Sequence, residues 1–322
     1  MLVRISVVIP VKNGAATLGA CLRGLYDQTL PPVEILVIDS GSTDATFDVL
    51  ADFPDVKVVK IPASEFDHGE TRNFGASMAI GELVLFTVQD ARSATREWLE
   101  IMANCLVSSA SAAVCGGQIV PHEDRYNPVE WYCPQSSPRT RVVHVASVEM
   151  FDCLTPKEKQ DLCGWDDVNA MYRRDVLTSH IRFRKTDFAE DAAWALDALR
   201  AGYTIAYCPA AAVLHSHVES YRYHVKRTVA VAYHRYKLFG ALPSDPSLFY
   251  EALRAAKTLI SRPTSWRNKA VWWWYNVNSA LGIRRAARSV RKALQDGEGE
   301  LFSLYQQVCR EVPQANATER RK

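Results

Sequence analysis

Carboxylates and histidines occur at a few separate points of this 322-residue sequence where they could act together on one substrate. They are Asp39, Asp90, the adjacent Glu190 and Asp191, and His215 with His217. Carboxylates brought to one place repel each other unless a cation joins them, so such a set indicates a hard divalent ion, Mg²⁺ or Mn²⁺. These ions also bridge diphosphates, which points to a nucleotide-linked substrate. A carboxylate that the ion does not need would be free to act as a base.

Each of these residues also has an ordinary structural interpretation. Asp90 is equally placed to cap a helix that follows it. Asp191 could interact with the dipole at a helix N-terminus, and His215 could pack at the end of a strand. Taken singly, these positions leave both interpretations open.

The first half of the chain predicts the elements that would position these residues. Four apolar segments, rich in β-branched residues, predict buried strands at residues 5–10, 34–38, 56–61 and 83–88. Segments with helical spacing separate them, including one from about Glu70 to Ile80. This alternation predicts an α/β fold with a mainly parallel sheet and right-handed crossovers. Asp39 and Asp90 follow two of the strands, at the carboxyl edge where open α/β sheets bind ligands.

The second half is less regular. Strands are predicted at residues 112–120 and 203–213, and helices near 192–199, 221–236 and 249–260. Residues 121–167 lack clear periodicity, which is typical either of a functional loop region or of a surface insertion.

Several classes of protein are poorly supported. Gly14 and Gly19 have the wrong spacing for a dinucleotide-binding fingerprint, and the segment that they enclose lacks the Lys of a phosphate-binding P-loop. The eight cysteines form no Cys-x-x-Cys pair, which favours reduced thiols in a cytosolic protein over a zinc site. No signal peptide is visible, and no apolar segment reaches the roughly 20 residues of a membrane span.

The charge is unevenly distributed. Residues 252–295 contain ten Lys or Arg and no Asp or Glu, so the rest of the chain keeps 28 basic against 36 acidic residues. The same segment contains Trp266, Trp272, Trp273, Trp274 and Tyr275. Basic residues with aromatic ones favour a helix lying on an anionic membrane surface. The alternative is a helical subdomain whose tryptophans pack on the rest of the protein. Nucleic-acid binding is disfavoured, because the remainder is acidic and shows no nucleic-acid motif.

The combined motifs resemble a known family. They are residues 5–13 (ISVVIPVKN), 37–44 (VIDSGSTD), 68–73 (HGETRN), 89–91 (QDA), 188–194 (FAEDAAW) and 215–217 (HSH). In this order they resemble family 2 glycosyltransferases with the GT-A fold, in the rhamnosyltransferase-like branch. The resemblance covers roughly residues 5–236. It implies a Rossmann-like catalytic domain over residues 1–236 and a helical, basic C-terminal extension over residues 237–322.

The resemblance also implies roles for individual residues. The donor nucleotide would be bound by Pro10, Asp39, Ser40, Arg72 and Gln89. The Asp39 carboxylate would accept a hydrogen bond from the imide N–H of uracil or thymine, and Arg72 would meet the base or the diphosphate.

The metal site departs from the family's commoner Asp-x-Asp pattern. Gln89 and Ala91 flank Asp90, so only one carboxylate remains. The resemblance implies that Asp90 holds Mg²⁺ or Mn²⁺ together with His215 or His217.

Asp191 matches the family's catalytic base, with Glu190 as the alternative. Asn169 and Trp165 would line the acceptor side, although an aromatic residue beside Asp166 and Asp167 is as often ordinary packing.

The sequence therefore predicts an inverting glycosyltransferase of bacterial polysaccharide synthesis. It would move rhamnose or another hexose from a dTDP- or UDP-sugar to a glycan or lipid-linked acceptor. We expect it in the cytoplasm, peripheral on the inner face of the membrane. Two alternatives remain: a non-catalytic nucleotide-sugar or glycan-binding subunit of the same fold, and, more distantly, a nucleotidyltransferase.

Overall fold

The computed structural model describes residues 3–121, 123, 127, 139–243, 247–260 and 265–309. They group into two compact units, one formed by residues 1–119 with 132–215 and the other by residues 120–131 with 216–322. Helix α9 (Tyr221–Phe239) runs through residue 236. The domain boundary expected there stays a prediction.

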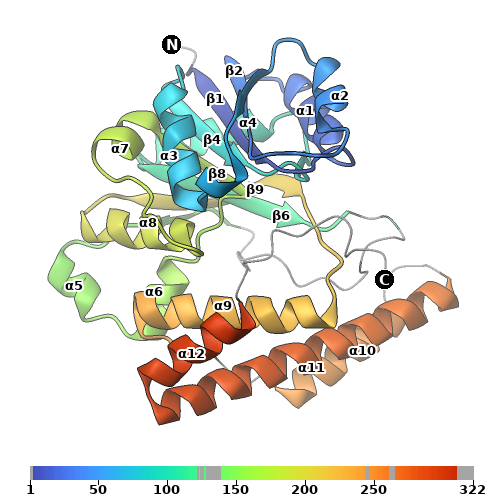
Figure 1. The fold of residues 1–322 in the computed structure, drawn as a ribbon. Coiled ribbons are helices and arrows are strands. Elements are labelled where there is room, and N and C mark those ends of the chain that lie inside the picture. Colours follow the sequence, from blue (N-terminus) through green and yellow to red (C-terminus); the bar gives the residue numbers. More distant parts are fainter. Residues whose placement is uncertain are drawn as a thin grey trace. The chain divides into compact units, whose positions relative to one another are not determined.

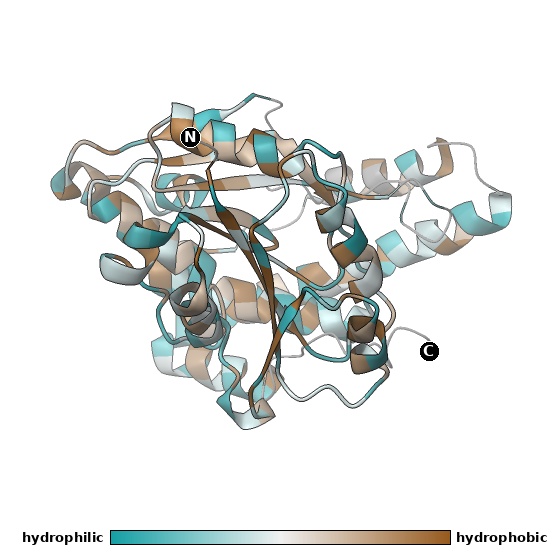
Figure 2. Cartoon of the chain, turned by 90° about the horizontal axis from the view of Figure 1, so that it is seen from above, coloured by the Kyte–Doolittle hydropathy of each residue, from teal (hydrophilic) through white to brown (hydrophobic). Residues whose placement is uncertain are grey.

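The first unit contains a mixed sheet whose first four strands are parallel (Figure 1). These strands are β1 (Ile5–Val11), β2 (Glu34–Asp39), β3 (Lys57–Lys60) and β4 (Leu83–Thr87), in the order β3-β2-β1-β4. Every residue of β2 and β4 is buried, as their unbroken apolar runs predict. Figure 2 shows the strands largely in the brown of apolar residues. The predicted parallel arrangement is confirmed for this half of the sheet.

The other half is mixed. Strand β8 (Asn169–Arg173) lies antiparallel between β4 and β6 (Ala113–Ile119), and β9 (Ile205–Leu214) runs parallel to β6. The short strands β5 (Arg92–Ser93) and β7 (Arg141–Val143) pair antiparallel with β9. Because β8 is antiparallel to both of its neighbours, β4 and β6 run in the same direction, as does β9. The carboxyl ends of β4, β6 and β9 therefore lie at one edge of the sheet.

Helices cover both faces of this sheet (Figure 1). They are α1 (Leu18–Tyr26), α2 (Thr46–Ala51), α3 (His68–Met78), α4 (Trp98–Ser108), α7 (Arg174–Ser179) and α8 (Glu190–Arg200). Helix α3 begins two residues before its predicted start, because the Asp67 side chain caps it by accepting hydrogen bonds from Gly69 N and Glu70 N. It lies beside α7 and α8, which makes contact between residues of α3 and α8 possible.

The segment without periodicity contains regular structure where it is described. Besides β7 it forms α5 (Val148–Asp152) and α6 (Pro156–Leu162), and α6 begins with a capping box between Thr155 and Glu158. These elements are too short to give a periodic signal. Most of residues 122–138 lie outside the described part of the chain.

The second unit is helical, as predicted. It contains α9, α10 (Leu248–Ile260), α11 (Trp266–Asp296) and α12 (Glu298–Val308). A small core between α9, α11 and α12 includes Val229, Val290, Leu301 and Tyr305. Among the described helices, none has both the length and the apolar character that crossing a membrane requires.

Candidate active site

Strand register brings several predicted residues to one edge of the sheet. Thr87 of β4 pairs with Asn169 of β8, so Asp90, which follows β4, and Asp166 and Asp167, which precede β8, lie at the same edge. His215 follows the last residue of β9 at this edge. The predicted convergence at the carboxyl ends of the strands is therefore present in the first unit.

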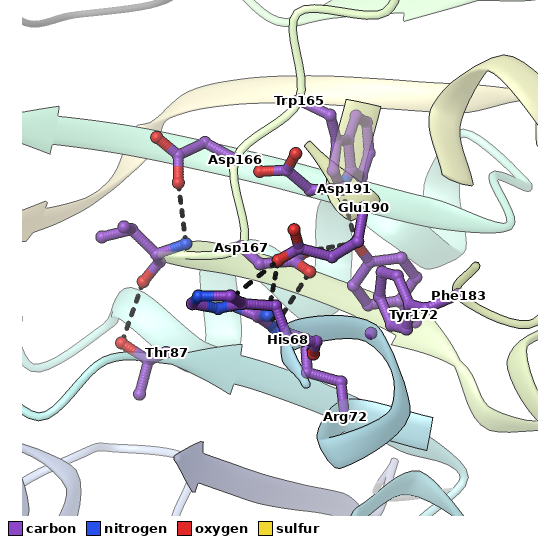
Figure 3. A network of polar contacts seen from close by, with 12 residues as sticks. His68, Arg72, Thr87, Trp165, Asp166, Asp167, Tyr172, Phe183, Glu190 and Asp191 are labelled. Carbon is purple, nitrogen blue, oxygen red and sulfur yellow. Dashed lines mark hydrogen bonds and ion pairs between the residues drawn. The ribbon is translucent and has the colours of Figure 1, made fainter. Parts of the chain in front are cut away.

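A buried ion-pair network joins α3 to the start of α8 (Figure 3). Arg72 donates a hydrogen bond from Nη1 to Glu190 Oε1 at 2.6 Å and to His68 O at 3.0 Å. Its Nε lies 3.1 Å from Asp167 Oδ2, a charge contact without hydrogen-bond alignment. The side chains of Arg72, Glu190 and Asp167 are 7%, 8% and 1% exposed, so solvent screens these charges weakly. The guanidinium is thus engaged by two carboxylates, and its predicted contact with the nucleotide stays a prediction.

Asp191 lies next to this network in the first turn of α8. Its Oδ1 accepts a hydrogen bond from Ala192 N at 2.7 Å, and no described cation lies within 4.0 Å of its carboxylate. Burial, together with the nearby charges of Glu190 and Asp167, raises the pKa of Asp191 well above its usual value. A raised pKa makes the ionised carboxylate a stronger proton acceptor, which suits a general base.

The backbone that leads into α8 is strained. Ala189 has a φ of 62°, in the left-handed region that residues with a Cβ rarely adopt. Such strain costs on the order of 1–3 kcal/mol and clusters at functional sites. It turns the chain directly before Glu190 and Asp191.

Asp167 belongs to the same network, a role that the sequence reading missed. Tyr172 donates its hydroxyl hydrogen bond to Asp167 Oδ1, and Trp165 Nε1 donates to Tyr172 OH at 2.6 Å. Burial raises the pKa of Asp167 to about 7. His68 was also missed as a site residue: its Nδ1 is 4.0 Å from Glu190 Oε1, and burial lowers its pKa. His68 lies inside the quoted motif at residues 68–73, which could have indicated it, whereas Asp167 lies outside all of the quoted motifs.

Asp39 carries an unsatisfied acceptor. It is 2% exposed, and its Oδ2 accepts hydrogen bonds from Gly41 N and Ser42 N, both at 3.1 Å. Its Oδ1 is buried and has no hydrogen-bond partner among the described residues. A buried acceptor without a partner is costly, so the atom is suited to a ligand donor.

The other predicted nucleotide-binding residues adjoin Asp39 or the end of β1. Pro10 pairs with Ile38 in the register of β1 and β2. Ser40 donates its hydroxyl to Val11 O at 3.2 Å. Gln89 bonds both backbone groups of Lys12, at 3.0 Å to its N and 3.1 Å to its O, which holds the loop after β4 against the end of β1.

Asp90 and His215 form the predicted metal-binding pair. His215 Nε2 lies 3.7 Å from Asp90 Oδ1, and the two side chains are 7% and 14% exposed. The chain continues from Asp90 into strand β5, so Asp90 does not cap a helix. A carboxylate facing an imidazole in a largely buried place is a donor set that fits a divalent cation. His217 belongs to the second unit, and its part in the site stays a prediction.

The two predicted acceptor residues are buried. The Asn169 side chain is fully buried and bonds Gly117 O at 2.9 Å, Ala211 O at 2.8 Å and Trp98 Nε1 at 3.0 Å. Trp165 is 5% exposed and packs against Trp194 and other aromatic rings. Packing and internal hydrogen bonds engage both side chains, and their predicted place on the acceptor side stays a prediction.

Comparisons with known proteins identify the family of the chain. The profile of the family described as glycosyl transferase family 2 matches residues 6–179. The O-antigen chain rhamnosyltransferase RfbN of Salmonella typhimurium is 31% identical over 218 residues, covering 66% of this chain and 67% of that protein. The O-antigen chain rhamnosyltransferase WbaN of Salmonella anatum is 32% identical over 222 residues, covering 66% of each. The match thus spans about two thirds of these relatives.

Solved structures share the fold at low sequence identity. TarS residues 1–349 of S. aureus, in complex with UDP-GlcNAc, superposes with a TM-score of 0.53 at 17% identity, covering 96% of this chain and 82% of that one. The mannosyltransferase PcManGT of Pyrobaculum calidifontis, in complex with GDP-Man and Mn²⁺, gives 0.51 at 17% identity, covering 97% and 81%. With the family profile matching more than half of its length, the chain belongs to glycosyltransferase family 2, has the GT-A fold and counts O-antigen rhamnosyltransferases among its relatives.

Proposed function

We propose that the chain is an inverting glycosyltransferase that uses a dTDP- or UDP-sugar, with Asp191 as the base. The observation that carries this proposal is the division of charge around α8. Arg72 pairs with Glu190 and Asp167, whereas the half-buried Asp191 has no cation within 4.0 Å of its carboxylate among the described residues. Of the two adjacent carboxylates, Asp191 is therefore the one free to take a proton.

In the proposed reaction Asp191 accepts the proton of an acceptor hydroxyl. That oxygen forms a bond to the anomeric carbon from the face opposite the nucleotide. The bond between this carbon and the diphosphate oxygen breaks, and the nucleoside diphosphate leaves with the electron pair. Attack from the opposite face inverts the anomeric configuration. The proton remains on Asp191 until it exchanges with solvent.

The buried Asp39 Oδ1 supports a uracil or thymine base, because the imide N–H of these bases would satisfy it. Rhamnose is proposed as the sugar because two relatives are rhamnosyltransferases of O-antigen chains. The acceptor proposed on the same ground is a glycan or a lipid-linked glycan.

Asp90 and His215 would hold Mg²⁺ or Mn²⁺, with His217 as a further ligand. When bound, the ion would supply positive charge that stabilises the departing diphosphate. Solved GT-A structures in complex with Mn²⁺ support this assignment.

The first test is calorimetric titration with dTDP, UDP, GDP and ADP, with and without Mn²⁺, on the wild type and on Asp90→Ala. We expect metal-dependent binding of the pyrimidine diphosphates that Asp90→Ala loses. Preference for a purine diphosphate would overturn the donor proposal. Binding of dTDP-rhamnose without release of dTDP, in the presence of O-antigen acceptors, would favour the non-catalytic alternative. Release of diphosphate from a nucleoside triphosphate would indicate a nucleotidyltransferase.

We also propose that the second unit contacts an anionic membrane through one face of α11. At helical spacing, this solvent-facing stripe comprises Trp266, Trp274, Leu281, Arg285, Arg288 and Lys292. The first three are 76%, 60% and 53% exposed, and the basic residues follow along the same stripe. Apolar aromatic groups beside positive charge complement a surface of anionic lipids. Trp272 does not belong to this stripe, because it is 6% exposed.

Co-sedimentation with phosphatidylglycerol-containing and with pure phosphatidylcholine vesicles tests the membrane proposal. We expect binding to the anionic vesicles at low salt, and a loss of at least about tenfold for Trp266→Ser with Trp274→Ser. Phe302→Ser is the matched control, since Phe302 of α12 is 51% exposed but lies off the stripe. Equal binding by the double variant would overturn the proposal. If light scattering shows dimers of the wild type and of Phe302→Ser but not of the double variant, the stripe binds a second copy of the chain instead.

A further inference from the structure

Gln118 connects His215, the metal ligand proposed above, to a carboxylate. It lies on β6, is 3% exposed, and its Oε1 is 3.0 Å from His215 Nδ1. Its Nε2 donates to Asp166 Oδ2 at 2.9 Å, and Asp166 Oδ1 accepts from Val168 N at 2.9 Å. The chain of hydrogen bonds therefore runs from the loop before β8, through Gln118, to the imidazole.

We infer that Gln118, oriented by Asp166, is a positioning residue that fixes the ring orientation and tautomer of His215, so that Nε2 faces Asp90 as a ligand for the divalent cation. This inference rests on the metal site proposed above. It assigns a role to two residues, Gln118 and Asp166, that do not themselves touch the metal or the substrate.

The chemistry of the donors and acceptors determines the direction of each bond. A carboxylate can only accept, so the amide NH₂ group of Gln118 faces Asp166 and its oxygen faces His215. An amide oxygen also only accepts, so His215 carries its hydrogen on Nδ1. In its neutral form a ring with this tautomer presents a lone pair at Nε2, 3.7 Å from Asp90 Oδ1. Two acceptors that face each other in a buried place favour a cation between them.

The fold holds this arrangement through a bulge between β6 and β9. The register jumps from Gly116↔Cys208 to Gly117↔Ala212, and beyond the jump Ile119 pairs with Leu214. Asn169 bonds Gly117 O and Ala211 O, which pins both strands at the bulge. Beyond it, His215 N donates to Ile119 O at 3.0 Å, which sets the imidazole beside Gln118. The buried Asn169 thus holds β6 and β9 together next to Gln118 and His215.

The tautomer can be measured without metal, donor or turnover. In protein labelled with ¹⁵N-histidine, long-range ¹H–¹⁵N correlation spectra distinguish Nδ1–H from Nε2–H rings, and the His215 signals are assigned by their absence in His215→Ala. We expect the Nδ1–H form in the wild type and in Gln118→Glu, which keeps an acceptor at this position. In Gln118→Met, which has similar volume and no acceptor for the ring, the Nδ1–H form should no longer be favoured. An Nε2–H ring in the wild type would overturn the inference.

Metal affinity provides the second readout. Calorimetric titration of Mn²⁺ in the presence of UDP should show about 10- to 100-fold weaker binding for Gln118→Met than for the wild type. Gln28→Leu is the matched control: Gln28 is also buried and bonds Gly24 O, Thr95 O and Leu99 N, away from this hydrogen-bond chain. Thermal melting confirms that each variant is folded at the assay temperature.

The outcomes separate the two proposals. Mn²⁺ binding that is equal in the wild type and Gln118→Met would overturn the role of Gln118 and leave the metal site standing. A wild type that binds UDP but no Mn²⁺ would overturn the metal site itself, and the role of Gln118 with it.

Discussion

Arg72 Nη1 lies 2.6 Å from Glu190 Oε1, although 118 positions separate the two residues in the sequence. The pair joins α3 to α8 and, with Asp167, forms a buried network. Glu190 is therefore held in an ion pair directly beside Asp191. This contact distinguishes Glu190, the alternative base, from the adjacent Asp191.

Removing Arg72 should strongly destabilise the fold. Arg72→Met leaves Glu190 and Asp167 buried without their cation, which typically costs about 3–5 kcal/mol. Urea denaturation followed by tryptophan fluorescence measures the change in the free energy of unfolding. The surface pair of Lys157 with Asp161 is the comparison, because both side chains are more than half exposed. Lys157→Met should change the stability by less than about 1 kcal/mol. Similar losses for the two variants would contradict the buried network.

Asp191→Asn should lower kcat about 10²- to 10⁴-fold, because the amide cannot take the acceptor proton. The fold should be at least as stable near pH 7, since the raised pKa of Asp191 shows that burial disfavours its ionised form. Release of nucleoside diphosphate and thermal melting give the two measurements. Glu190→Gln should destabilise the fold, because it weakens the pair with Arg72, but should retain more turnover. If folded Glu190→Gln loses more turnover than Asp191→Asn, Glu190 is the base.

The contribution of Asp167 to the stability of the fold should fall as the pH rises from about 4 to about 7. The pKa of Asp167 is about 7 in the folded protein, against about 3.9 for an unfolded chain. Between these values the folded state binds more protons than the unfolded state, so raising the pH favours unfolding. Asp167→Asn should flatten this part of the profile, measured as the urea midpoint at successive pH values. An unchanged slope would show that Asp167 does not retain its proton in the fold.

Asp39→Asn should change the base preference of the nucleotide site. The wild type should bind UDP more tightly than CDP, because N3 of cytosine is an acceptor and cannot donate to Asp39 Oδ1. A hydrogen bond to a charged group contributes about 1.5–3 kcal/mol, so the ratio should change by roughly 10- to 100-fold in the variant. Calorimetric titration measures both affinities. Ser109→Ala is the control, because its hydroxyl bonds Cys105 O at the end of α4, and the ratio should not change.

Much of the fold could be predicted from the sequence, because local sterics and burial determine it. The apolar run of β4 and the spacing of apolar residues in α1 depend only on neighbours along the chain. The reversed strand β8 could not be predicted, because the direction of a short strand depends on which distant strand it meets.

For the site, the order of residues along the chain was enough to predict that Asp39, Asp90 and His215 stand at or just after the ends of strands. The pairing of the polar groups could not be predicted in this way. In the folded chain Arg72 pairs with Glu190, Asn169 and Trp165 are buried, and Gln118 contacts His215. A buried polar group must find a partner within about 3 Å. Strand register and helix packing, which no local pattern records, choose that partner.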